Sequence, residues 1–130
     1  MEVPLREYLG SMVLGYLITI AVESAVLIVG LSRRHSFRSK CIAGLWLTAC
    51  TYPVVWLVLP PLFPEPDESW LYLLVAEAFA PSAECILFQL AFLHGLPSNR
   101  RLFARDMLSI IAANFASFGV GELIGSAFWD

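Results

Sequence analysis

Residues 9–31 read LGSMVLGYLITIAVESAVLIVGL, and Glu23 is the only charged residue in this stretch. A helix needs about 20 apolar residues to cross the hydrocarbon core of a bilayer, so the stretch is long enough to span a membrane once. A soluble helix of this length would carry a stripe of charged residues along one face, and this one does not. The stretch therefore predicts a membrane-spanning helix.

Three more apolar stretches follow, and the segments that connect them are short and polar. Short connections make consecutive helices antiparallel neighbours. The expected fold class is all-α: a polytopic membrane protein in which four transmembrane helices form an antiparallel bundle. We expect residues 1–130 to form a single integral membrane domain, with spans at about 9–31, 41–63, 70–94 and 107–129.

The composition agrees with this prediction and excludes several classes of protein. Hydrophobic residues make up 58% of the chain and charged residues only 15%, against about 25% charged in a typical soluble domain. So few charges could not cover a soluble enzyme, and a net charge of −3 does not suit a nucleic-acid partner. The lipid bilayer is the expected partner. The three cysteines lack CxxC or Cys–His spacing, so no cofactor is expected, and the sequence leaves a metal ion open.

The basic residues predict the orientation of the chain. The second connection carries no Lys or Arg, whereas all but Arg6 of the eight basic residues fall in the first and third connections. Cytoplasmic loops carry an excess of Lys and Arg, so both termini are predicted to be extracytoplasmic in a multi-pass protein. The basic residues of the two connections are Arg33, Arg34, Arg38 and Lys40, and Arg100, Arg101 and Arg105.

Four glutamates lie inside the predicted spans: Glu23, Glu77, Glu84 and Glu122. A charged side chain at the bilayer centre costs about 2.5–3.5 kcal/mol on insertion scales, and such residues are expected to face the bundle interior. No Lys, Arg or His lies at the same depth to pair with them. We therefore expect them to be neutral at rest, to share protons, or to hold a cation, because burial disfavours the charged form.

Depth along the helices, at about 1.5 Å per residue, sorts the polar residues into two tiers. The predicted middle tier contains Glu23, Glu84, Asn114 and Thr51, with Thr48 nearby, and the predicted outer tier contains Glu77 and Glu122. Glu77 and Glu84 are seven residues apart and share one helix face. These residues are the candidate site for a proton or cation, and no catalytic residue is assigned.

The two halves of the chain share a weak pattern. It consists of a glutamate, a double arginine and a polar residue followed three positions later by a hydroxyl. It predicts two helical hairpins related as a parallel repeat, with a site at their interface near mid-membrane. The members are Glu23, Arg33-Arg34 and Thr48/Thr51 in the first half, and Glu84, Arg100-Arg101 and Asn114/Ser117 in the second.

Prolines and glycines indicate special backbone positions. Pro53 and Pro81 each remove the helical donor to a carbonyl four residues earlier, and inside a membrane such a carbonyl needs another partner. Gly121 and Gly125 form a GxxxG pair, which lets a second backbone approach closely. That backbone belongs either to this chain or to a second copy, so a homo-oligomer or partner membrane subunits are expected.

Three functions remain open at this point. The leading hypothesis is that the intramembrane glutamates bind or move a proton or cation. The alternative is a non-catalytic structural or assembly subunit of a larger membrane complex. An intramembrane enzyme is uncertain, since the chain has no HExxH or GxSxG motif, and His35 and His94 are read as interfacial polar residues. The four-span size and the Glu23 position resemble small multidrug-resistance exporters in architecture alone.

Overall fold

The computed structural model describes residues 4–129, and all of the regular structure in them is helical. Four helices are long and apolar enough to cross a membrane, which confirms the all-α prediction and the presence of four long apolar helices. The elements are α1 (Leu5–Gly30), α2 (Phe37–Pro53), the π-helical η1 (Val54–Val58), the 3₁₀ turns η2 (Pro60–Leu62) and η3 (Pro66–Glu68), α3 (Ser69–Phe92) and α4 (Arg100–Trp129).

The ends of the helices follow from local capping groups. The Ser36 side chain accepts a hydrogen bond from the Ser39 amide and begins α2, as an N-cap serine does. Gly95 takes a positive φ of 79° after α3, a conformation that only glycine adopts readily. Asn99 accepts from the Leu102 amide at 3.1 Å. The segment before residue 107 was expected to be a loop, and this expectation is wrong, because Asn99 caps a helix that begins at Arg100.

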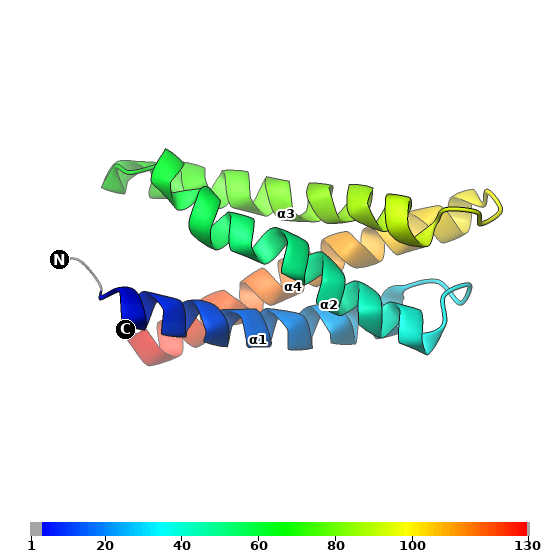
Figure 1. Ribbon diagram of the computed structural model, residues 1–130, viewed down its shortest axis with the longest axis horizontal. Helices are drawn as coiled ribbons and strands as arrows, with labels where there is room; N and C mark the ends of the chain where they lie inside the picture. The colour runs from blue at the N-terminus through cyan, green and yellow to red at the C-terminus, as the bar shows by residue number, and fades with distance from the viewer. Residues whose placement is uncertain (1–3, 130) are drawn as a thin grey trace.

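The four helices form a bundle in which each helix has two neighbours. α1 contacts α2 and α4, and α3 contacts the same two helices. Figure 1 shows α2 and α4 running obliquely between α1 and α3. Both termini and the 54–68 connection lie at one end, which we call the terminal end, and the other two connections lie at the opposite end, which we call the arginine end.

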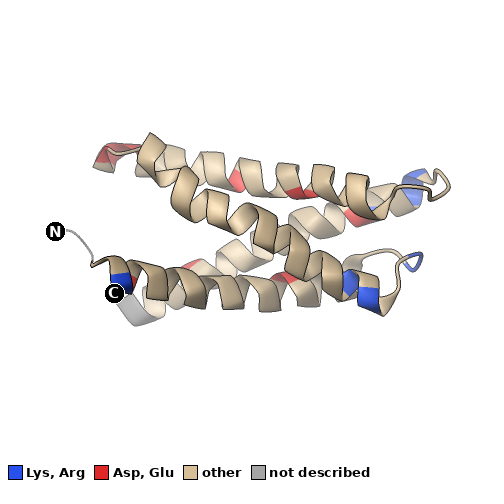
Figure 2. Cartoon of the chain, viewed as in Figure 1, with Lys and Arg blue, Asp and Glu red and all other residues tan. Residues whose placement is uncertain are grey.

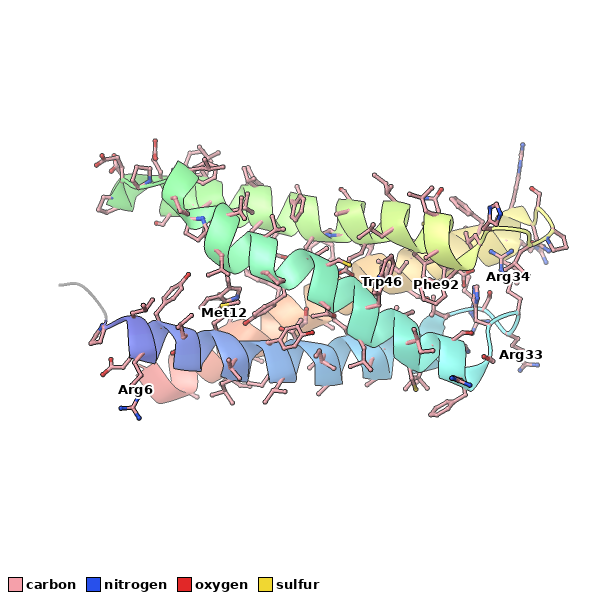
Figure 3. All side chains as sticks on the ribbon, in the orientation of Figure 1. Arg6, Met12, Arg33, Arg34, Trp46 and Phe92 are labelled. Atoms are coloured by element: carbon pink, nitrogen blue, oxygen red, sulfur yellow. The ribbon has the colours of Figure 1, made fainter. Side chains whose placement is uncertain are left out.

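The charged residues gather at the two ends of the bundle. Figure 2 shows most Lys and Arg at the arginine end, and acidic residues in the connection at the terminal end. In Figure 3, Arg33 and Arg34 lie at the arginine end, whereas Arg6 lies at the terminal end. Further acidic positions lie along the helices between the two ends (Figure 2), so the charged groups in the middle of the apolar helices are carboxyls.

The main cluster of buried apolar residues lies in the half of the bundle toward the arginine end. Trp46 of α2 and Phe92 of α3 face each other there, with ring centroids 6.1 Å apart (Figure 3). Two glycines also permit close helix contacts in this half: Gly30 lies against Ser109, and Gly44 lies against Ser24. The buried core residues are Leu27, Leu31, Ala43, Leu47, Phe88, Ile110 and Ala113.

The GxxxG pair in α4 does not make a close contact with another described helix. Apart from chain neighbours and the nearby backbone of α4 itself, no atom of the described residues lies within 4 Å of a Cβ placed on Gly121 or Gly125. The same holds for Gly119. Close contacts to a helix glycine are instead made at Gly30 and Gly44, and at Gly15, which lies against the Tyr52 side chain, whereas the glycines near the end of α4 face open space.

Candidate functional site

Two buried carboxyls occupy the middle of the bundle. Glu23 on α1 is 3% exposed and Glu84 on α3 is 2% exposed. Glu84 Oε1 lies 2.7 Å from Thr51 Oγ1, and Glu84 Oε2 accepts a hydrogen bond from Asn114 Nδ2 at 2.8 Å. The structure thus brings together three of the four residues predicted for the middle tier.

Glu23 has different partners on the same two helices. Its Oε2 lies 2.8 Å from Thr48 Oγ1 of α2, and its Oε1 lies 2.7 Å from Ser117 Oγ of α4. Thr48 and Thr51 are three residues apart, which is about 4.5 Å of helix rise. The two carboxyls therefore bind to the same pair of helices within about one turn of each other. Ser117 was not among the predicted site residues, although it lies one turn from Asn114.

The two glutamates have equivalent hydrogen-bond partners in the two hairpins, α1–α2 and α3–α4. The two polar positions of a hairpin are Thr48 and Thr51 in the first hairpin, and Asn114 and Ser117 in the second. Each glutamate contacts the first of these positions in its own hairpin and the second in the other hairpin. For Glu23 these are Thr48 and Ser117, and for Glu84 they are Asn114 and Thr51. Exchanging the two hairpins therefore leaves the hydrogen-bond pattern unchanged.

Each hydroxyl at the site also faces a carbonyl of its own helix. Thr48 Oγ1 lies 2.8 Å from the Gly44 oxygen, Thr51 Oγ1 lies 3.1 Å from the Leu47 oxygen, and Ser117 Oγ lies 2.9 Å from the Asn114 oxygen. A hydroxyl has a single proton to donate. It can donate to an ionised carboxylate, or it can donate to the carbonyl and accept from a protonated carboxyl. The contacts are compatible with both protonation states.

The Asn114 amide limits where a proton can lie on Glu84. Asn114 Nδ2 lies 3.0 Å from the Ile110 carbonyl oxygen, which only accepts, so the nitrogen of the amide must face this side. The same nitrogen donates its other hydrogen to Glu84 Oε2. A proton on Glu84 therefore lies on Oε1 and is donated in a hydrogen bond to Thr51 Oγ1, whose own hydroxyl then donates a hydrogen bond to the Leu47 carbonyl.

A cavity of about 610 Å³ begins at these carboxyls and extends toward the terminal end. Its walls come from the terminal halves of all four helices and reach Tyr8, Pro60 and Gly125 near the helix ends. The predicted outer-tier residues Glu77 and Glu122 both line it. Glu77 is partly buried and Glu122 is exposed, and they share the wall of the cavity with the two deeper carboxyls.

The aromatic wall of the cavity depends on an irregular segment after α2. The Leu59 amide donates to the Val54 carbonyl, five residues back, in the π-helix η1, which leaves the Val55 carbonyl without its usual donor. Residue 60 is a proline, so it cannot donate to the Trp56 carbonyl.

Two tyrosines bind the carbonyls that η1 frees. Tyr72 Oη of α3 donates to the Val55 oxygen at 2.9 Å, and Tyr8 Oη of α1 donates to the Trp56 oxygen at 2.5 Å. The sequence predicted freed carbonyls at other positions, four residues before Pro53 and Pro81, which are Ala49 and Glu77. The structure keeps α2 helical through Pro53 and opens the backbone directly after it.

A second polar cluster lies at the arginine end and was not predicted. Asp106 is fully buried and accepts from the Ser32 amide at 2.7 Å and from Arg34 Nη2 at 2.9 Å. His35 Nε2 lies 2.9 Å from the same carboxyl. The predicted third connection extended to residue 106, which is wrong, because Asp106 lies in α4. His35 lies in the connection between α1 and α2 and is buried against Asp106. Asn99 as a helix N-cap is the signal that could have placed Asp106 inside α4.

Two further basic residues cap the end of α1. Arg105 Nε donates to the Gly30 oxygen at 2.8 Å, and Lys40 Nζ donates to the Leu31 oxygen at 3.1 Å. The last carbonyls of a helix have no partner inside the helix, so these side chains satisfy them. The basic connections therefore hold the arginine end together in addition to their predicted role in orientation.

The described residues contain no group of three or more His, Cys, Asp and Glu side chains that could hold a metal ion. No family model matches the chain, and no curated protein or solved structure is found to be similar to it. The function must therefore be argued from the site itself.

Proposed function

We propose that this chain is a multi-pass membrane protein that binds a proton or a monovalent cation at Glu23 and Glu84 and moves it across the bilayer. The observation that carries the proposal is the hydrogen bonding of the two buried carboxyls. Each carboxyl can gain or lose a proton and keep the same hydrogen-bond partners. This is possible because each adjoining hydroxyl can donate its proton either to the carboxylate or to a backbone carbonyl of its own helix.

The surroundings of the carboxyls support a proton site over a fixed ion pair. No basic side chain hydrogen-bonds to either of them among the described residues. An isolated buried carboxylate is strongly disfavoured and usually takes up a proton instead. Hydroxyl and amide neighbours stabilise both forms, which is what a group that exchanges its proton repeatedly requires.

The membrane setting is also part of the proposal. Many large apolar side chains face outward, among them Leu17, Val29, Leu74 and Leu108, each more than half exposed. Exposed apolar surface of this extent is typical of a face that contacts lipid or a partner. The excess of basic residues at the arginine end supports the further proposal that this end faces the cytoplasm and that both termini face outside.

The two halves of the bundle suggest how movement across the membrane would work. The cavity reaches Glu23 and Glu84 from the terminal end, while the apolar core and the Asp106 cluster close the arginine end. We interpret this arrangement as an outward-open state. The exchanged hydrogen bonds support the parallel repeat of two hairpins, and rocking of one repeat against the other is a common route to alternating access.

Proton flux into liposomes tests the proposal. The purified protein is reconstituted in vesicles that contain a pH-sensitive dye, and a pH gradient is imposed. We expect flux above that of empty vesicles, and its loss in Glu84→Gln and Glu23→Gln. Glu65→Gln is the matched control, because Glu65 is exposed in the 54–68 connection. If both site variants carry the same flux as wild type, the proposal is wrong.

One observation favours a second candidate, a structural or assembly subunit of a larger membrane complex. The open face at Gly119, Gly121 and Gly125 offers room for a second backbone, and small residues at such positions favour helix association in membranes. Purification in a mild detergent distinguishes the two. A partner present in stoichiometric amount supports the subunit, and a homo-oligomer or a monomer argues against it.

A further inference from the structure

A groove at the arginine end lies apart from the site described above. Its volume is about 380 Å³, which is within the range of about 300–1,000 Å³ for small-molecule sites. Its walls come from the last turn of α3, the connection that follows and the first turn of α4, and Arg34 reaches it from the α1–α2 connection. None of its lining residues lines the cavity that contains Glu23 and Glu84.

The polar side chains of the groove suit an anion. Arg34 and Arg100 are its charged lining residues, and no Asp or Glu is among the described residues that line it. Asn99 also lines it. The Asn99 oxygen accepts from the Leu102 amide, so the NH₂ group of Asn99 is left to donate to another acceptor.

The surroundings of the groove carry charge of the same sign. Residues 32–40 and 93–106 together contain seven Lys and Arg and a single acidic residue, Asp106. The Asp106 side chain is fully buried and does not line the groove. An anion that enters the groove therefore meets a field that attracts it from every side.

Arg34 is held in a fixed direction by Asp106. Arg34 Nη2 donates to Asp106 Oδ2 at 2.9 Å, and Arg34 Nε lies 3.3 Å from the same oxygen. Arg34 Nη1 makes only a long contact of 3.5 Å, with the carbonyl oxygen of Pro97, which lines the groove. A guanidinium has more N–H donors than these contacts use, so donors remain on the side that faces the groove.

Apolar side chains complete the groove. Leu96 and Phe103 line it and are 38% and 41% exposed. The groove also begins where the apolar helix α3 ends, at Phe92. In a membrane this position lies between the hydrocarbon core and water, where the phosphates of phospholipids are found beside the upper ends of their acyl chains.

We propose that the groove binds the phosphate headgroup of an anionic phospholipid. Arg34 Nη1, Arg100 and the Asn99 amide donate to the phosphate oxygens, and the acyl chains pack on Leu96 and Phe103. Arginine is well suited to bind phosphate oxygens, and basic pockets between transmembrane helices on the cytoplasmic side bind lipid headgroups. The inference rests on the membrane setting of the proposed function and on neither of its two carboxyls.

Native mass spectrometry of the full-length protein released from detergent tests the proposal, because it counts the lipids that each chain retains. The probe is dioleoylphosphatidylglycerol, and its matched control is dioleoylphosphatidylcholine, which has the same acyl chains and a phosphate but no net charge. We expect the anionic lipid to bind at least about fivefold more tightly than the control. Equal binding of the two lipids would overturn the proposal.

Two neighbouring arginines separate the groove from the overall charge. Arg100 and Arg101 are both exposed in the first turn of α4, but only Arg100 lines the groove. Arg100→Gln should weaken the binding of phosphatidylglycerol about fivefold, and Arg101→Gln should leave it nearly unchanged. Circular dichroism checks that both variants fold. An equal loss in both would show that the lipid responds to net charge and not to the groove, and would overturn the proposal.

Competition separates a lipid from a soluble anion. Glycerol 3-phosphate carries the phosphate without acyl chains, and we expect a large excess of it to leave phosphatidylglycerol bound. Displacement of the lipid would overturn the assignment of the groove to a phospholipid and favour a soluble phosphate ester instead.

This inference and the proposed function can fail separately. The double variant Glu23→Gln/Glu84→Gln should bind phosphatidylglycerol as wild type does, because neither carboxyl lines the groove. Selective lipid binding in a protein without proton flux overturns the proposed function alone. Proton flux that depends on Glu23 and Glu84, in a protein that does not distinguish the two lipids, overturns this inference alone.

Discussion

The two halves of this bundle use the same four helices for opposite purposes. Toward the arginine end, Gly30 and Gly44 allow the helices to approach Ser109 and Ser24 closely, and large apolar side chains fill the space between them. Toward the terminal end, the glycines of α4 face open space, and tyrosines span the gap to carbonyls freed in η1. In the packed half, glycines thus bring neighbouring helices together, whereas in the half with the cavity Gly15 contacts the side chains of Tyr52 and Trp56.

The largest effect is expected where the packed half is closed, at Asp106. Asp106→Ala removes the acceptor for the Ser32 amide, for Arg34 and for His35. Breaking a buried ion pair by removing one partner typically costs about 3 kcal/mol or more, so we expect a loss of about 3 kcal/mol in the free energy of unfolding. The measurement is an unfolding titration in mixed micelles with increasing dodecyl sulfate.

Asp67→Ala is the control for this substitution, since Asp67 is an exposed acidic residue in the 54–68 connection. It should change the free energy of unfolding by less than about 0.5 kcal/mol. If Asp106→Ala is as stable as this control, the Asp106 cluster does not close the arginine end.

A pair of glycine substitutions tests the comparison between the halves directly. In Gly44→Ala the new methyl would meet the Ser24 side chain and lie 3.0 Å from the Ser24 Cα, so one helix must move, at about 1–3 kcal/mol for overpacking. In Gly121→Ala no atom of the described residues lies within 4 Å of the new methyl, and the stability of the monomer should hold or rise slightly. Both are measured by the same unfolding titration, and equal destabilisation by the two substitutions would contradict the contrast.

The smallest expected effect concerns the tyrosine links in the terminal half. Tyr72→Phe leaves the Val55 carbonyl without its side-chain donor, at about 1 kcal/mol for one hydrogen bond. Tyr16→Phe is the matched control, because the Tyr16 hydroxyl has no hydrogen bond to a described residue. Hydrogen exchange of the 54–59 amides should rise in Tyr72→Phe and stay unchanged in Tyr16→Phe. The same exchange rate in both variants would show that the tyrosine does not hold η1.

The composition of residues 9–31 and of the three stretches like it was enough to predict four long apolar helices. Counting depth along them also placed Glu84 level with Thr51 and Asn114, because a regular helix rises by a constant amount per residue. Height alone does not determine which face of a helix a side chain occupies. For this reason the partners of Glu23 were not predicted, although Thr48 was placed near its level.

Other features depend on hydrogen-bond register, which composition does not report. Pro53 predicted a freed carbonyl but not the shift of the Leu59 amide to the Val54 carbonyl that creates the sites for Tyr8 and Tyr72. The fourth span was expected to begin at residue 107, whereas Asn99 caps a helix that begins at Arg100 and so includes Asp106. Local caps and register shifts therefore account for most of what the sequence did not reveal.

Infrared difference spectroscopy of the purified protein tests the central claim, that Glu23 and Glu84 exchange protons, most directly. Spectra recorded in acidic and alkaline buffer should differ by an acid carbonyl band that is replaced by carboxylate bands. We expect Glu84→Gln and Glu23→Gln each to remove part of this difference and the double variant to lack the buried component entirely. A difference spectrum that is the same in the double variant and in wild type would show that the two glutamates do not exchange protons.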